Sequence, residues 1–102
     1  MERRLNMEKG YTNVMEEMVT TLVHVLMASP DYQTFCSCAK CRNDIIAISL
    51  NNLPSHYVTT ADGRRMIFEQ LNTKENLTWI NKRIINAIHH VGKYPKHFSS
   101  ND

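Results

Sequence analysis

The stretch CSCAKCRNDIIAISLNNLP (residues 36–54) joins a cysteine-rich segment to a dense apolar run. All three cysteines of the 102-residue chain lie in it, spaced Cys36-x-Cys38-x-x-Cys41. The apolar run ends at two asparagines before Pro54, which is typical of a helix end. We therefore predict a short helix, buried on most of its sides, with Cys41 at its start. Free N–H groups and the helix dipole at this position favour the thiolate form of Cys41.

The flanking sequence predicts two amphipathic helices. Apolar residues repeat on one helical face over residues 13–28, where Asn13 can serve as the N-cap. A second stripe covers residues 74–91, with Thr73 as the cap and Gly92 in the position after the last turn. These repeats are typical of a mainly helical protein.

Between these helices, the sequence carries the signals of a short β-hairpin. Residues 57–60 favour a strand, Asp62-Gly63 indicates a turn, and residues 66–68 form the returning strand. A helix over residues 65–71 is the competing interpretation. Either way, the chain length favours one domain.

Composition excludes several classes of protein. The net charge is only +2, and no stripe of basic and aromatic residues is evident, so direct DNA binding is not expected. No apolar run approaches the roughly 20 residues that a bilayer requires, so we expect no membrane insertion. Residues 1–6 lack the apolar stretch of a secretory signal, which favours a cytoplasmic location. In that compartment, clustered thiols are typically metal ligands or redox groups and not disulfides.

The cysteine spacing favours a structural Zn²⁺ site. The Cys38-x-x-Cys41 pair can reach one ion across a tight turn, and Cys36 adds a third sulfur. Zinc takes four ligands, and spacing alone does not choose the fourth. The candidates are His24, His56, His89, His90, His97, Asp44, a water molecule and a group from a partner chain. We name His97 as the fourth ligand, which completes the predicted set with Cys36, Cys38 and Cys41.

Other uses of the thiols stay open. A redox dithiol at Cys38-x-x-Cys41 lacks the βαβ pattern that usually accompanies it. Iron–sulfur or copper sites use similar ligands, and the three thiols could carry no ligand at all. A nucleophilic cysteine paired with a histidine lacks an evident oxyanion site. We therefore predict a protein that is not an enzyme.

The ordered pattern around the thiols resembles the late-competence ComFB family of bacteria. The resemblance rests on the motif Cys36-x-Cys38-x-x-Cys41-x-x-Asp44, Ala47, Leu50-Asn51-x-Leu53-Pro54 and Tyr57-Val58. The flanks NVMEEMV and VGKYPKH (residues 13–19 and 91–97) are also similar, so the resemblance covers roughly residues 13–97.

The resemblance implies a small, mostly helical, zinc-binding homodimer. Its implied role is an accessory or regulatory one in the competence state, in which cells take up DNA, with other competence proteins as partners. The alternative that it implies is a receptor for a cyclic dinucleotide (c-di-AMP or c-di-GMP). Arg64 and Arg65, with Lys82-Arg83, are the candidate anion site for such a ligand.

The prediction is thus a single ComFB-like domain over residues 1–102, with residues 1–12 and 99–102 flexible. Its fold class is mainly α: a small helical domain with a zinc-binding Cys loop and a short β-hairpin.

Overall fold

The structure, a computed structural model, describes residues 10–93. In chain order its elements are β1 (Thr12–Asn13), α1 (Val14–Met27), the 3-10 helix η3 (Pro30–Tyr32), α2 (Ala39–Asn51), β2 (Tyr57–Val58), α3 (Ala61–Leu71) and α4 (Lys74–Lys93). The mainly helical class is therefore confirmed. Of the segments predicted to be flexible, residues 1–9 and 99–102 lie outside the described part, while Thr12 begins β1.

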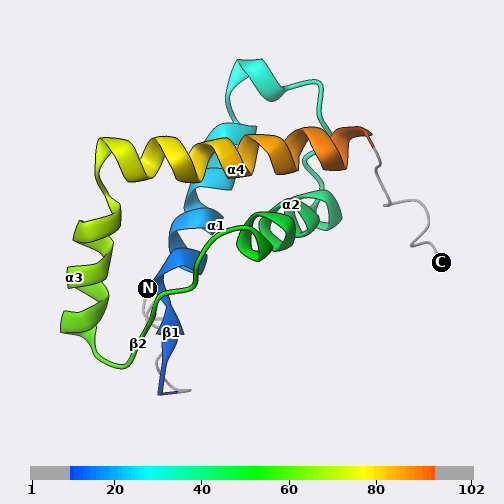
Figure 1. Cartoon of the computed structure of the whole chain (residues 1–102). Coiled ribbons are helices and arrows are strands. Elements are labelled where there is room, and N and C mark those ends of the chain that lie inside the picture. The colour runs from blue at the N-terminus through cyan, green and yellow to red at the C-terminus, as the bar shows by residue number, and fades with distance from the viewer. Residues whose placement is uncertain (1–9, 94–102) are drawn as a thin grey trace.

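Helix α4 packs against both α1 and α2 (Figure 1). Helix α3 stands to one side, on the opposite side of α1 from α2, and contacts α1 and β2. The core lies where α1, α2 and α4 meet. Its fully buried apolar side chains are those of Val14, Met15, Val19, Val23, Cys41, Ile45, Ile80, Ile84, Ala87 and Ile88. No described helix has the length and apolar character that crossing a membrane requires.

The start of α1 is fastened to the chain that follows α2. Asn13 is the N-cap of α1, as predicted, and its side-chain oxygen accepts a hydrogen bond from the Met15 N–H at 3.2 Å. The same oxygen accepts the His56 N–H at 2.8 Å, from 43 residues further along the chain. In return, the Val14 N–H donates to the His56 carbonyl at 2.8 Å. One asparagine therefore caps a helix and anchors a distant loop.

A two-stranded antiparallel sheet is present, but its partners differ from the predicted hairpin. β2 pairs with β1, placing Thr12 opposite Val58 and Asn13 opposite Tyr57. The prediction that residues 66–68 return as a strand is wrong, because they lie in α3. The physical reason is the side chain of Thr60, which accepts the Gly63 N–H at 2.9 Å and so caps a helix. The Asp62-Gly63 signal thus marks a first helical turn, in line with the competing helical interpretation.

Helix α2 is less buried than predicted. Only one stripe is fully buried, made of Cys41, Ile45 and Ser49 at steps of four residues. Ile46 and Ile48 are half-buried, and Ala47 is exposed. The expectation of burial on most sides is therefore wrong, because the described elements cover α2 fully only along the stripe of Cys41, Ile45 and Ser49.

We predict that Asn13→Ala lowers the free energy of unfolding by about 2 kcal/mol. The substitution removes an N-cap, typically worth about 1 kcal/mol, and leaves the His56 N–H without its acceptor. Urea denaturation followed by circular dichroism measures the change.

Asn86→Ala, at an exposed position on α4, is the matched control and should change stability by no more than about 0.5 kcal/mol. Equal effects of the two substitutions would show that the Asn13 contacts contribute nothing.

Candidate metal centre

The three thiols converge at the beginning of α2. Cys38 is the N-cap residue, Cys41 lies in the first turn, and Cys36 lies two residues before the cap. Their sulfur atoms all lie within 4.8 Å of one another. The predicted convergence of the three cysteines is therefore what the structure shows.

Two hydrogen bonds hold the loop on the helix. The Cys41 N–H donates to the Cys38 sulfur at 3.4 Å, so a thiol takes the place that a serine or aspartate oxygen often has at an N-cap. The Arg42 guanidinium donates to the carbonyl of Ser37, between the first two cysteines. The loop is thus positioned by the helix that it precedes.

This donor set fits a zinc ion. Sulfur ligands about 2.3 Å from a tetrahedral Zn²⁺ lie about 3.8 Å apart, so the sulfurs here need to approach one another by at most about 1 Å. Three thiolates and one further ligand form a common structural zinc set.

The thiols differ in acidity. The Cys41 N–H, donated to the Cys38 sulfur, lowers the pKa of Cys38, and a hydrogen bond from the Cys36 side chain adds to this effect. Burial raises the pKa of Cys41 to about 12, and its hydrogen bonds with the other two cysteines act in the same direction. The prediction that the helix start favours the thiolate of Cys41 is therefore wrong. Desolvation dominates at Cys41, and the helix start instead favours the thiolate of Cys38.

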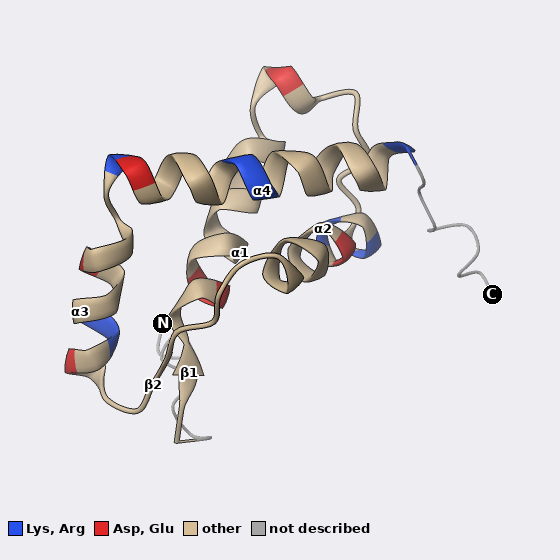
Figure 2. Cartoon of the chain, viewed as in Figure 1, with Lys and Arg blue, Asp and Glu red and all other residues tan. Residues whose placement is uncertain are grey.

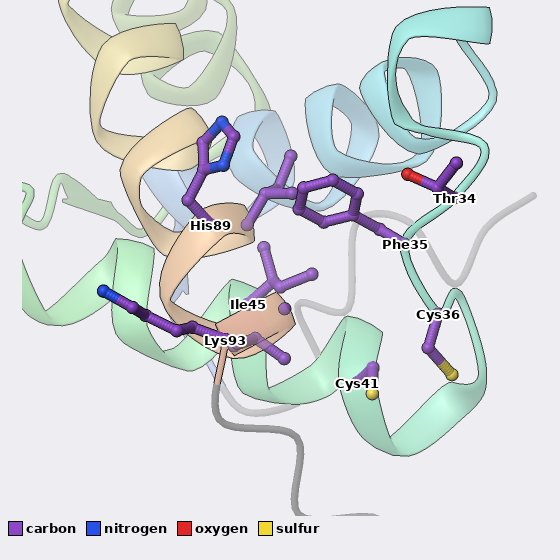
Figure 3. Close-up of a pocket in the computed structure, with 10 residues that line it drawn as sticks. Thr34, Phe35, Cys36, Cys41, Ile45, His89 and Lys93 are labelled. Carbon is purple, nitrogen blue, oxygen red and sulfur yellow. The ribbon is translucent and has the colours of Figure 1, made fainter.

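A cavity of about 600 Å³ lies beside the thiols. Figure 3 shows Cys36 and Cys41 at one edge and the Phe35 ring directed toward α4. The ring of His89, on α4, lies edge-on to Phe35 with centroids 5.3 Å apart. Lys93, the last described residue, also lines this cavity.

Gly92 explains the approach of Phe35 to α4. A Cβ atom on Gly92 would lie 2.9 Å from the Phe35 ring, so only glycine leaves room for the ring as placed. The prediction that Gly92 follows the last turn is wrong, because α4 continues to Lys93. The sequence analysis did not predict this cavity. The one local feature that could have indicated it is Gly92, a glycine within the apolar repeat of α4.

The structure separates the candidates for the fourth ligand. Within residues 10–93, no histidine, aspartate or glutamate joins the three-thiol group. His24 bonds the Thr20 carbonyl on α1 at 2.9 Å, and Asp44 pairs with Lys40 at 3.2 Å. Of the described histidines, His89 lines the cavity beside the thiols. His97, the residue named from the sequence, lies outside the described residues.

The arginines of the candidate anion site pair with carboxylates, whereas a phosphate site would leave them available to a ligand. Arg64 donates to Glu17 at 2.7 Å, and Arg65 lies 3.4 Å from Asp62. The Arg83 guanidinium lies over the Trp79 ring. Figure 2 shows acidic residues close to the basic ones on α2 and α3. The carboxylates beside Arg64 and Arg65 compete with any phosphate for these two side chains.

Comparisons with known proteins agree on one family. The family model described as "Late competence development protein ComFB" matches residues 12–95. A solved structure, described as that of the late competence protein ComFB from Bacillus subtilis, is similar with a TM-score of 0.70 and 26% sequence identity. The match covers 83% of this chain and 93% of that one. No curated protein matches this chain.

We predict that iodoacetamide modifies Cys38 faster than Cys41 in the metal-free protein at about pH 8, where the thiolate fraction controls the rate of alkylation. The lowered pKa of Cys38 gives it a larger thiolate fraction, whereas Cys41, with a pKa of about 12, stays protonated until the pH approaches that value. Peptide mass spectrometry after timed alkylation measures both rates. Equal rates would contradict the assigned order, and urea-unfolded protein is the control in which the difference should vanish.

Proposed function

The chain belongs to the late competence development protein ComFB family, and from this we propose that it is a zinc-binding, dimeric accessory protein of bacterial late competence. It acts in the cytoplasm, in the process of DNA uptake, through contacts with other competence proteins and not through catalysis. The observation that carries the proposal is the three-thiol group at the start of α2, which lies inside the family match. Residues 1–102 form a single ComFB-like domain in this proposal.

Zinc has a structural role here. The ion joins the loop that carries Cys36 to the first turn of α2, whose Cys41 is buried in the core. In small zinc peptides, metal binding contributes on the order of 10 kcal/mol. That is comparable with the whole stability of a small domain. The metal therefore fixes the segment that leads from η3 into α2.

His97 completes the zinc site in this proposal. Lys93 lines the same cavity as Cys36 and Cys41. Four residues of extended chain span at most about 14 Å, enough to bring His97 from the end of α4 back across the cavity. A neutral imidazole with three thiolates is an established zinc set, and it leaves the net charge of the site at −1.

A second copy of the chain accounts for apolar surface that one chain leaves in water. Val25, Tyr57 and Met66 are each more than half exposed. The isoleucines at 46 and 48 add half-buried surface on α2. Two-fold dimers are the commonest way in which soluble proteins cover such surface.

The thiol chemistry favours a structural role over catalysis. Without a metal, burial raises the pKa of Cys41 to about 12, which disfavours the thiolate that a nucleophilic cysteine needs. A cyclic-dinucleotide receptor is the alternative function. It receives less support, because Arg64 and Arg65 already face carboxylates.

We predict that native mass spectrometry finds a dimer with one zinc ion per chain. His97→Ala should weaken zinc binding by more than the roughly 10- to 100-fold typical of losing a residue that only supports a ligand. Competition with a chromogenic chelator measures the affinity.

His24→Ala is the matched control, since His24 is exposed on α1 and bonds its own helix. If His97→Ala binds zinc as the control does, His97 is not the ligand. If His89→Ala alone weakens binding, His89 is the ligand. Protein purified without chelators that carries no zinc would overturn the metal proposal itself.

The cellular role predicts a loss of natural transformation. In a competent strain that lacks its own copy, the wild-type chain should restore the transformation frequency, and Cys38→Ser/Cys41→Ser should not. Ala47→Ser, at an exposed position on the same helix, is the control that should restore it. Equal restoration by all three chains would contradict a zinc-dependent role in DNA uptake.

A further inference from the structure

The start of α2 holds Cys38 and Cys41 one helical turn apart. The Cys41 N–H donates to the Cys38 sulfur at 3.4 Å, and the Arg42 N–H donates to the Cys38 carbonyl at 2.9 Å. One turn of helix places Cα atoms three residues apart at about 5 Å, within the range of roughly 4.4–6.8 Å found across disulfides. The two sulfurs lie within 4.8 Å of each other. A bond between them therefore needs a change of side-chain position and no rearrangement of the backbone.

The two thiols differ in their access to solvent. Cys38 is exposed at the N-cap, whereas Cys41 is buried and only 1% exposed. A dissolved oxidant therefore reaches Cys38, and the sulfur of Cys41 is reached from within the protein. Cys36 is also exposed, but it lies in the loop before the cap and is not placed by the helix. An accessible thiol beside a second, resolving thiol is the arrangement in which proteins oxidise cysteines reversibly.

We infer that Cys38 and Cys41 form a reversible oxidation site for hydroperoxides. In the first step the Cys38 sulfur attacks the terminal oxygen of the hydroperoxide. The S–O bond forms, the O–O bond breaks, and an alcohol (water, for hydrogen peroxide) leaves with the thiol proton. The Cys41 sulfur then attacks the Cys38 sulfur, forming the S–S bond and breaking the S–O bond, and the hydroxyl group leaves as water with the Cys41 proton. Two thiols have lost two electrons, the peroxide has gained them, and a dithiol reductant reverses the reaction by exchange.

Oxidation at this site excludes the metal. The sulfurs of a disulfide no longer offer thiolates to an ion, so Cys36 is the one thiol of the three that stays available. This consequence rests on the zinc site proposed above, whereas the oxidation itself requires no ion. The start of α2 thus has two alternative links, a metal that includes the Cys36 loop and a disulfide that leaves this loop out.

Hydrogen peroxide treatment of the full metal-free chain tests the inference. The remaining thiols are blocked with iodoacetamide, and trypsin then cleaves after Lys40, between the two cysteines. A Cys38–Cys41 bridge leaves residues 10–40 joined to residues 41–42, whereas a Cys36–Cys38 bridge stays inside one peptide. Mass spectrometry should find the joined peptides as the main bridged product, and dithiothreitol should separate them.

Two serine variants identify the thiols that react. Cys36→Ser should form the joined peptides as the wild type does, because the loop thiol takes no part. Cys38→Ser should lower their yield by at least about tenfold, since it removes one partner of the exchange. Serine is itself a favoured N-cap residue, so this variant keeps the start of α2. Equal yields from the two variants, or a bridge that forms mainly between Cys36 and Cys38 or between two chains, would overturn the inference.

The zinc-loaded chain separates this inference from the zinc proposal. With a chromogenic chelator too weak to remove zinc from the reduced chain, peroxide should release one ion for each bridge formed. A chain that forms the Cys38–Cys41 bridge but never binds zinc would support the oxidation site and overturn the zinc proposal. A chain that binds zinc but forms no such bridge, with or without the ion, would overturn the oxidation site alone.

Discussion

The buried stripe of α4 is the contact on which the other helices depend. Ile80, Ile84 and Ile88 are fully buried, and α4 packs on α1 and α2 together. Burying three such side chains contributes roughly 5–9 kcal/mol, a large share of the net stability of a domain of this size. The same helix places Gly92 against Phe35, so the loop that carries the thiols is positioned by the end of the stripe.

The elements that the sequence predicted well are those with a strong period. The apolar repeats of α1 and α4 extend over several turns, and Asn13 and Thr73 cap them as expected. The hairpin was misjudged because Thr60, Asp62 and Gly63 suit a turn and a helix start equally. The Thr60 cap commits these residues to a helix start, and β2 pairs with β1, more than forty residues away. No local pattern identifies that strand partner.

The sequence predicted which sulfur atoms form the candidate metal site, but it did not predict the burial of Cys41 or the cavity beside the site. Spacing alone was enough to bring three sulfurs together at a helix start. The spacing could not show that Cys41 faces the core, because apolar residues occur on several sides of α2 and the sequence does not indicate which side packs against α1 and α4. The pKa order of the thiols follows from that burial. The cavity depends on Phe35 and Gly92, which are 57 positions apart by their residue numbers and meet only in the folded chain.

The sulfur of Cys38 accepts the Cys41 amide directly, so one atom both caps α2 and belongs to the three-thiol group. The start of the helix and the geometry of the thiols therefore cannot vary independently. A shift in the first turn of α2 changes the spacing of the sulfurs as well.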